Sequence, residues 1–180
     1  MGFFSRYFEG YTEEKRPGED GRMHTVRTYR GFWYVPALSG PRRVLRCAGY
    51  LALYAAGAAF FLAGASRREI ANSTSYVGLA TGVSLFALVI QIIPLAGCAF
   101  GKARQTAYQY RSGSKTCILW ARRITAGAMA LTAALALLAG LLEDGIRFAP
   151  LLFALGSLSE AGIGLAESRI EYYTEHNENA

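Results

Sequence analysis

The chain has 180 residues, of which 52% are hydrophobic and 18% are charged, and its formal net charge is +6. This length is typical of one domain. The charged residues are separated from the apolar ones: residues 1–43 hold five acids and eight bases, whereas residues 76–100 hold no charge. A helix of about 20 apolar residues crosses a bilayer core of about 30 Å. The sequence therefore predicts an integral membrane protein and excludes a soluble globular domain.

The N-terminal arm, residues 1–43, is the one long polar region of the sequence. Five aromatic residues near its start recur at helical spacing, which predicts an amphipathic helix with an aromatic stripe. They are Phe3, Phe4, Tyr7, Phe8 and Tyr11. The stripe suits the membrane interface or a neighbouring protein, and the alternative is that it folds back on the second half of the arm.

The second half of the arm has the composition of a turn followed by extended chain. Residues 15–21 (KRPGEDG) predict the turn. Residues 23–35 are rich in β-branched and aromatic side chains, which predicts one strand or two short strands around Gly31.

Four segments are long and apolar enough to be predicted as transmembrane helices: residues 44–65, 76–100, 121–142 and 148–166. Glu160 interrupts the fourth, and an acid in the middle of a span costs about 2.5–3.5 kcal/mol on insertion. We expect the apolar remainder and the three neighbouring helices to offset that cost. The predicted fold is an all-α four-helix transmembrane bundle (residues 44–166), preceded by the cytoplasmic arm and followed by an acidic cytoplasmic tail (residues 167–180).

The positions of the basic residues predict the orientation of the chain. Sixteen of the 19 lysines and arginines belong to one side of the membrane: nine up to and including Arg46, six between the second span and Arg123, and Arg169 after the fourth span. This asymmetry predicts that both termini are cytoplasmic and that the protein lies in the plasma membrane, which is the inner membrane if the chain is bacterial.

Several bases of the arm are expected to contact the anionic lipid headgroups of the cytoplasmic face, at about 1 kcal/mol each. They are Arg27, Arg30, Arg42 and Arg43. A nucleic-acid partner is not expected, because the orientation of the chain already accounts for these charges.

Small residues recur at four-residue steps along the predicted spans, a spacing that lets helix backbones approach closely. The second span carries Gly78 and Gly82, and then Gly97 and Gly101 at its end. The third span carries Ala128, Thr132, Ala136 and Gly140, and the first carries Ala48, Ala52 and Ala56, with Ala59 one turn further on. The pattern predicts tight helix packing, either within one chain or between subunits.

Polar residues in the four spans fall at a similar predicted depth. With a rise of 1.5 Å per residue, they form one layer about 6–12 Å below the cytoplasmic edge. They are Tyr50, Gln91, Thr125 and Glu160, with Arg46 about one turn nearer the surface. Ionisable groups inside a membrane usually face the interior of the protein and mark a functional site. We therefore expect Glu160 to point inward.

The expected partners of Glu160 are Gln91 or Tyr50 through a hydrogen bond, or Arg46 through an ion pair. Arg122 or Arg123 could also extend toward this layer. A structural network, a position near the surface, and a role in ion or proton movement are the three interpretations of Glu160.

Pro94 lies inside the second span, where proline removes the hydrogen bond to the carbonyl of Ile90. This predicts a kink, with Gln91 close to the freed carbonyl.

The sequence offers little for catalysis or for cofactor binding. Cys47, Cys98 and Cys117 are an odd number without a C-x-x-C pair, and all three lie near the predicted cytoplasmic face, where a disulfide is not expected. The two histidines lie near opposite ends of the chain, so no His and Cys cluster has zinc-ligand spacing. No metal site or cofactor is therefore predicted.

We predict a non-enzymatic membrane protein that acts as a scaffold or accessory subunit. Its expected partners are the lipid bilayer and either further copies of the chain or another membrane protein. The alternative is a small transporter or channel-like protein that uses the polar layer around Glu160.

Overall fold

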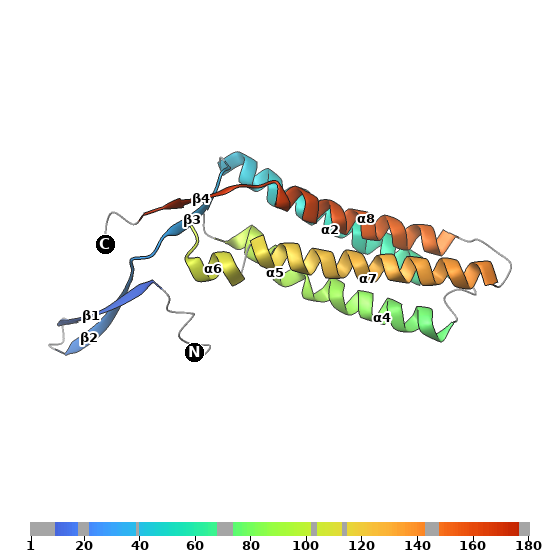
Figure 1. The fold of residues 1–180 in the computed structure, drawn as a ribbon, viewed down its shortest axis with the longest axis horizontal. Coiled ribbons are helices and arrows are strands. Elements are labelled where there is room, and N and C mark those ends of the chain that lie inside the picture. The colour runs from blue at the N-terminus through green and yellow to red at the C-terminus, as the bar shows by residue number, and fades with distance from the viewer. Residues whose placement is uncertain are drawn as a thin grey trace.

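The structure of the protein is a computed structural model, which describes residues 10–17, 22–38, 40–67, 74–101, 104–112, 115–142 and 148–176. This part of the chain is mostly helical, and it contains four helical segments long and apolar enough to cross a membrane. Figure 1 shows the long helices running side by side, with the strands and one short helix beyond one end.

The four apolar segments are built from five helices. α2 covers Gly40–Ala65, α7 covers Lys115–Leu142 and α8 covers Phe148–Ser168. The second segment is divided into α4 (Ser75–Ile90) and α5 (Ile92–Phe100). The four predicted helices are confirmed, but α2 and α7 begin four and six residues before the predicted starts. The short helix α6 (Ala107–Ser112) precedes α7.

The interruption between α4 and α5 lies at Gln91, three residues before Pro94. The backbone of Gln91 keeps a nearly helical conformation, with φ −66° and ψ −15°. The side chain of Gln91 was expected to lie close to the freed carbonyl of Ile90. Its amide instead donates to the carbonyl of Ala121 on α7 at 3.0 Å.

The helices contact one another in a defined order. α8 contacts both α2 and α7, α7 also contacts α4, and α5 contacts α2. Glycine permits a close backbone approach between α2 and α8. A Cβ at Gly57 would lie 3.3 Å from the carbonyl oxygen of Gly156, and a Cβ at Gly156 would lie 3.1 Å from that of Gly57. Small residues do allow backbones to meet, as expected, but these two were not in the predicted stripes.

The predicted stripe on α7 faces the other helices. Thr132 and Ala136 are fully buried, and Ala128 and Gly140 are half-buried. Thr132 also shares a hydrogen bond of 3.0 Å with Ser84 of α4.

The predicted stripe of the second segment faces away from the chain. Gly78, Gly82 and Gly97 are exposed, and a Cβ at Gly78 or Gly82 would meet nothing within 4 Å. Gly101 follows α5 and is half-buried. The inner face of α4 is formed instead by larger or polar residues, namely Val77, Ala80, Ser84 and Leu88. The α2 stripe behaves in the same way, since Ala48, Ala52 and Ala59 are exposed and Ala56 is half-buried.

The fold is not all-α, because the regions outside the long helices form two small sheets. β1 (Tyr11–Pro17) and β2 (Met23–Tyr29) are an antiparallel pair, and β3 (Trp33–Pro36) pairs with β4 (Tyr172–Glu175) from the C-terminal region. The two-strand prediction for residues 23–35 is confirmed. The pairing of β3 with the predicted acidic tail was not expected from the sequence.

Two predictions for the arm are wrong. Tyr11 belongs to β1 and not to a helix, and residues 15–17 of the predicted turn also belong to β1, which continues through Pro17. Residues 18–21 of the predicted turn lie outside the described residues. Cross-strand pairing explains both, because residues 11–17 find partners in β2 over their whole length. The other residues of the predicted aromatic stripe, Phe3, Phe4, Tyr7 and Phe8, lie outside the described residues.

Ion pairs connect the side chains of the β1–β2 hairpin. Arg16 and Arg30 donate to Glu14 at 2.8 and 2.9 Å, and Arg27 donates to Glu13 at 2.8 Å. The hydrogen bond and charge of Arg16, with a smaller contribution from Arg30, hold the pKa of Glu14 below its ordinary value. The hairpin lies beyond the end of the helices (Figure 1).

Candidate functional site

A buried ion pair joins α7 to α8. Arg122 Nη1 donates a hydrogen bond to Glu160 Oε2, and the same nitrogen donates to Gln91 Oε1 at the junction of α4 and α5. The exposed fraction is 1% for Arg122 and 0% for Glu160 and Gln91. Moving a charged group out of water costs several kcal/mol. Each of these buried groups therefore needs the others to offset that cost.

Helix α2 covers the remaining side of this ion pair. The ring of Tyr54 lies 5.6 Å from Arg122 Cζ, a distance that allows a cation–π interaction, and Tyr54 OH donates to the carbonyl of Leu88 at 3.0 Å. A Cβ at Gly57 would lie 3.2 Å from Glu160 Oε1, so glycine is what leaves room for the carboxylate. All four apolar segments therefore contribute to one enclosed site.

Glu160 points inward, as expected, but its partner is Arg122. Arg122 lies seven residues into α7, about two helical turns from its start, because that helix begins at Lys115 and not near residue 121. The sequence places this base at the edge of a span, whereas in the structure it is buried against α8, about one turn after the start of the apolar segment at Ile118. Tyr50 and Arg46, which were expected near Glu160, bind a different acid.

That acid is Glu167, which is also fully buried on α8. Tyr50 OH donates to Glu167 Oε2 at 2.7 Å, and Arg46 Nε lies 3.7 Å from the same oxygen. Tyr172 OH, from β4, donates to Glu167 Oε1 at 3.1 Å. Sequence reasoning missed Glu167 because it was assigned to the tail. Its spacing of seven residues from Glu160 was the available signal, since it places both acids on one face of a helix.

Two thiols border the Glu167 cluster. Arg46 Nη2 donates to Cys98 Sγ at 3.3 Å, and Cys98 Sγ lies 2.9 Å from Cys47 Sγ. Both cysteines are free. The side chain of Cys117 lies outside the described part of the chain.

Thr125 is buried but joins neither acid. Its hydroxyl donates to the carbonyl of Ala121 in its own helix at 3.0 Å, the same oxygen that accepts from Gln91. The predicted single layer is thus two clusters along α8. Counting depth from the span ends could not separate them, because it ignores the direction in which each side chain leaves its helix.

The described residues contain no group of three His, Cys, Asp or Glu side chains that could hold a metal ion. A pocket of about 450 Å³ opens between α2 and α5, and neither Glu160 nor Arg122 lines it. The arrangement of buried charges is suited to holding helices together, because Arg122–Glu160 bridges α7 and α8, and Arg46–Glu167 bridges α2 and α8.

Comparison with protein-family models, with curated proteins and with solved structures finds no match to the chain. What the protein does is therefore inferred from its own residues.

Proposed function

We propose that the chain is a multi-pass membrane protein that acts as a non-catalytic scaffold or accessory subunit, in a homo-oligomer or a larger membrane complex. The observation that carries this proposal is the outward-facing pair Gly78 and Gly82 on α4. Small residues at this spacing serve close helix contact, and a Cβ at either position would meet no other part of the described chain within 4 Å. A helix of another chain is the partner that this surface fits.

The buried ion pairs support a structural role for the four-helix bundle. Arg122 and Glu160 are enclosed on all sides by protein side chains, and they link helices that lipid alone would not hold together. The transporter alternative has less support, because it requires Glu160 to meet water or a substrate.

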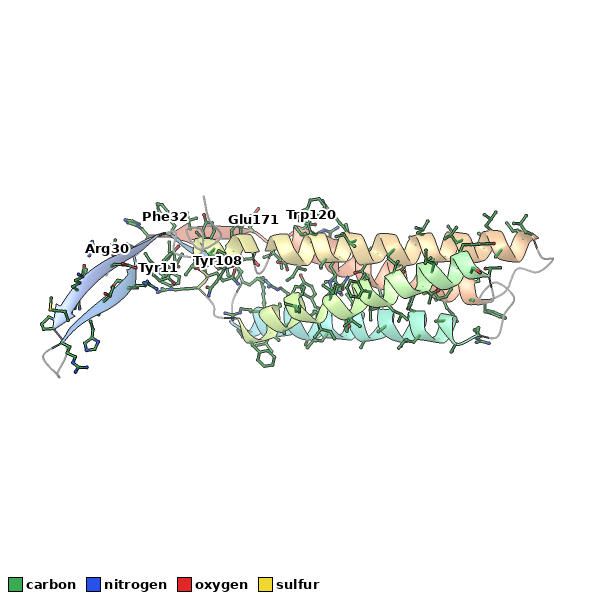
Figure 2. The ribbon with its side chains drawn as sticks, turned by 90° about the horizontal axis from the view of Figure 1, so that it is seen from below. Tyr11, Arg30, Phe32, Tyr108, Trp120 and Glu171 are labelled. Carbon is green, nitrogen blue, oxygen red and sulfur yellow. The ribbon has the colours of Figure 1, made fainter. Side chains whose placement is uncertain are left out.

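The proposed orientation places the strands and α6 in the cytoplasm. These elements lie beyond the same end of the long helices (Figure 1), and most of the basic residues belong to that side. Trp120, which is 60% exposed, points away from the helices near this end (Figure 2), as expected of a ring at the membrane interface. We propose the plasma membrane as the location.

Not all of the arm's arginines remain available for anionic lipid headgroups. Arg27 and Arg30 pair with carboxylates of β1, and Arg43 donates to the carbonyl of Gly101. Arg42 is exposed at the start of α2 and is the residue we propose to contact headgroups.

The proposal is tested by purifying the chain from its native membrane in a mild detergent and identifying bound proteins by mass spectrometry. We expect a stoichiometric second membrane protein or a defined oligomer. The double variant Gly78→Leu, Gly82→Leu should retain roughly tenfold less partner, equivalent to about 1.4 kcal/mol of association free energy, because leucine holds the two helices apart.

The matched control is Gly127→Leu on α7, which is also exposed and where a Cβ would also meet nothing within 4 Å. It should bind as the wild type does. Recovery of a monomer without partners would contradict the proposal. An ion flux into vesicles that is lost in Glu160→Gln would instead favour the transporter.

A further inference from the structure

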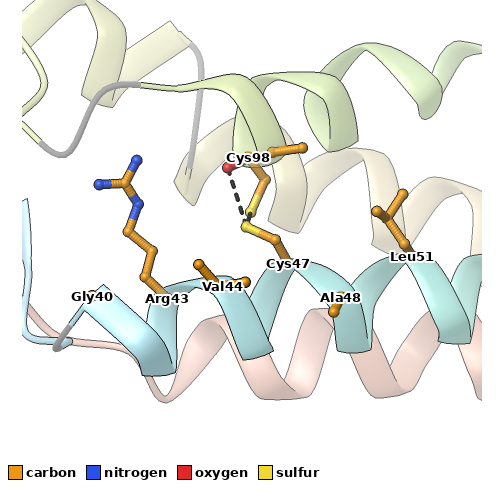
Figure 3. Close-up of a pocket in the computed structure, with 8 residues that line it drawn as sticks. Gly40, Arg43, Val44, Cys47, Ala48, Leu51 and Cys98 are labelled. Carbon is orange, nitrogen blue, oxygen red and sulfur yellow. Dashed lines mark hydrogen bonds between the residues drawn. The ribbon is translucent and has the colours of Figure 1, made fainter.

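Helices α2 and α5 bring two thiols to the wall of one pocket. Figure 3 shows Cys47 on α2 facing Cys98 on α5, with Arg43 extending along the same opening. Cys47 is half-buried, and Cys98 is 7% exposed. The pocket therefore gives a small molecule a route to Cys47 first.

The distance between the two sulfurs favours a disulfide over a shared metal ion. Cys47 Sγ and Cys98 Sγ lie 2.9 Å apart. A disulfide has its sulfurs about 2.05 Å apart, whereas two thiolates on one tetrahedral zinc lie about 3.8 Å apart for Zn–S bonds of about 2.3 Å. A shift of less than one ångström would bring the pair to bonding distance.

We propose that Cys47 and Cys98 are a redox-active thiol pair that exchanges with a low-molecular-weight disulfide, such as oxidised glutathione, and closes to a reversible disulfide between α2 and α5. The two residues are 51 positions apart, so the bond would join two separate spans. This inference rests on the thiol geometry alone and does not depend on the proposed scaffold function.

The exchange proceeds in two balanced steps. The Cys47 thiolate attacks the incoming disulfide RSSR, which forms Cys47–S–SR and releases one RS⁻. The Cys98 thiolate then attacks Cys47 Sγ and releases the second RS⁻. The two thiol protons end on the two released RSH molecules, so the thiol pair is oxidised by two electrons and RSSR is reduced by two.

The surroundings of Cys98 connect this chemistry to the Glu167 cluster. Cys98 Sγ accepts a hydrogen bond from Arg46, which also lies 3.7 Å from Glu167. Oxidation would convert the Cys98 thiol that Arg46 contacts into a disulfide sulfur. In a reducing compartment the pair would rest as free thiols and close only transiently, which is the usual behaviour of redox-sensing cysteines.

The test uses the full chain in detergent micelles, equilibrated in glutathione buffers of fixed reduced-to-oxidised ratio. Acid quenching and alkylation with N-ethylmaleimide then count free thiols by intact mass. With three cysteines in the chain, we expect three alkylated thiols in the reduced buffer and one in the oxidised buffer. Peptide mapping should identify a Cys47–Cys98 bond.

Cys117→Ser is the matched control, and it should form the same bond. Cys47→Ser and Cys98→Ser should each abolish it. If either of these variants fails to fold, the test rests on whether the peptide map of Cys117→Ser shows the Cys47–Cys98 bond. A bond that includes Cys117, three thiols that remain alkylated in the oxidised buffer, or a glutathione adduct that persists on Cys47 would each overturn the proposal.

Discussion

At the scale of single residues, the Arg122–Glu160 pair illustrates how a charge is kept inside an apolar protein. Glu160 has one charged partner, and Gln91 accepts from the same arginine nitrogen. Among the described residues, Arg122 Nε, Arg122 Nη2 and Glu160 Oε1 have no hydrogen-bond partner. The pair is therefore costly to bury, and it is more costly still to break, since the remaining charge would have no counter-ion.

This argument predicts that single and double substitutions differ in their effect on stability. Arg122→Met and Glu160→Leu should each lower the free energy of unfolding by about 3–5 kcal/mol, because each leaves one buried charge. The free energy of unfolding of the double variant should be much closer to that of the wild type. Unfolding in sodium dodecyl sulfate, followed by circular dichroism, measures all four proteins as a double-mutant cycle. A double variant whose loss equals the sum of the two single losses would contradict the coupling.

At the scale of elements, the contact between α2 and α8 depends on glycine. The two backbones meet where Gly57 faces Gly156, directly beside Glu160. One turn further along α2 the contact continues with aromatic rings, since Phe61 packs on Phe153 with ring centroids 5.0 Å apart. A side chain at Gly57 would therefore separate the helices and also displace the carboxylate.

We predict that Gly57→Leu lowers the free energy of unfolding by about 3 kcal/mol, the upper part of the usual range for overpacking. Gly49→Leu is the control, because Gly49 lies on the same helix and its Cβ would meet nothing within 4 Å. The control should change stability by no more than about 0.5 kcal/mol. Thermal unfolding in detergent measures both, and equal effects of the two substitutions would show that α2 and α8 do not meet as described.

At the scale of the whole molecule, the N-terminal arm pairs with the C-terminal region, and both contact the helices. β3 of the arm pairs with β4 of the C-terminal region. Tyr110 of α6 stacks on Tyr34 of β3 with centroids 4.3 Å apart, and it also contacts Tyr172 of β4 at 5.2 Å. The hydroxyl of Tyr172 reaches Glu167, so the strands outside the helices are linked to a buried acid.

This link predicts that Tyr172→Phe loosens the β3–β4 sheet. A hydrogen bond to a charged acceptor contributes about 1.5–3 kcal/mol, and its loss should speed the exchange of the β3 amides at Trp33, Tyr34 and Val35 by about tenfold or more. Tyr173→Phe is the matched control, because Tyr173 is 48% exposed and should not affect exchange. Hydrogen–deuterium exchange with mass spectrometry measures both variants, and unchanged exchange in Tyr172→Phe would refute the link.

The amino-acid sequence was sufficient to predict the four helices, the inward direction of Glu160 and the extended residues on both sides of Gly31. Each of these follows from local properties. Apolar length sets whether a segment can cross a bilayer, the cost of an exposed intramembrane charge turns an acid inward, and β-branched residues favour strands.

Tertiary structure decided which groups meet. Arg122 pairs with Glu160 because α7 begins two turns before that arginine, and because its side chain is directed toward α8. Gly78 faces outward while Gly57 faces inward, although both belong to helices with many small residues. The physical reason is that spacing along a helix groups residues on one face, but only packing against the other helices selects the face that turns inward.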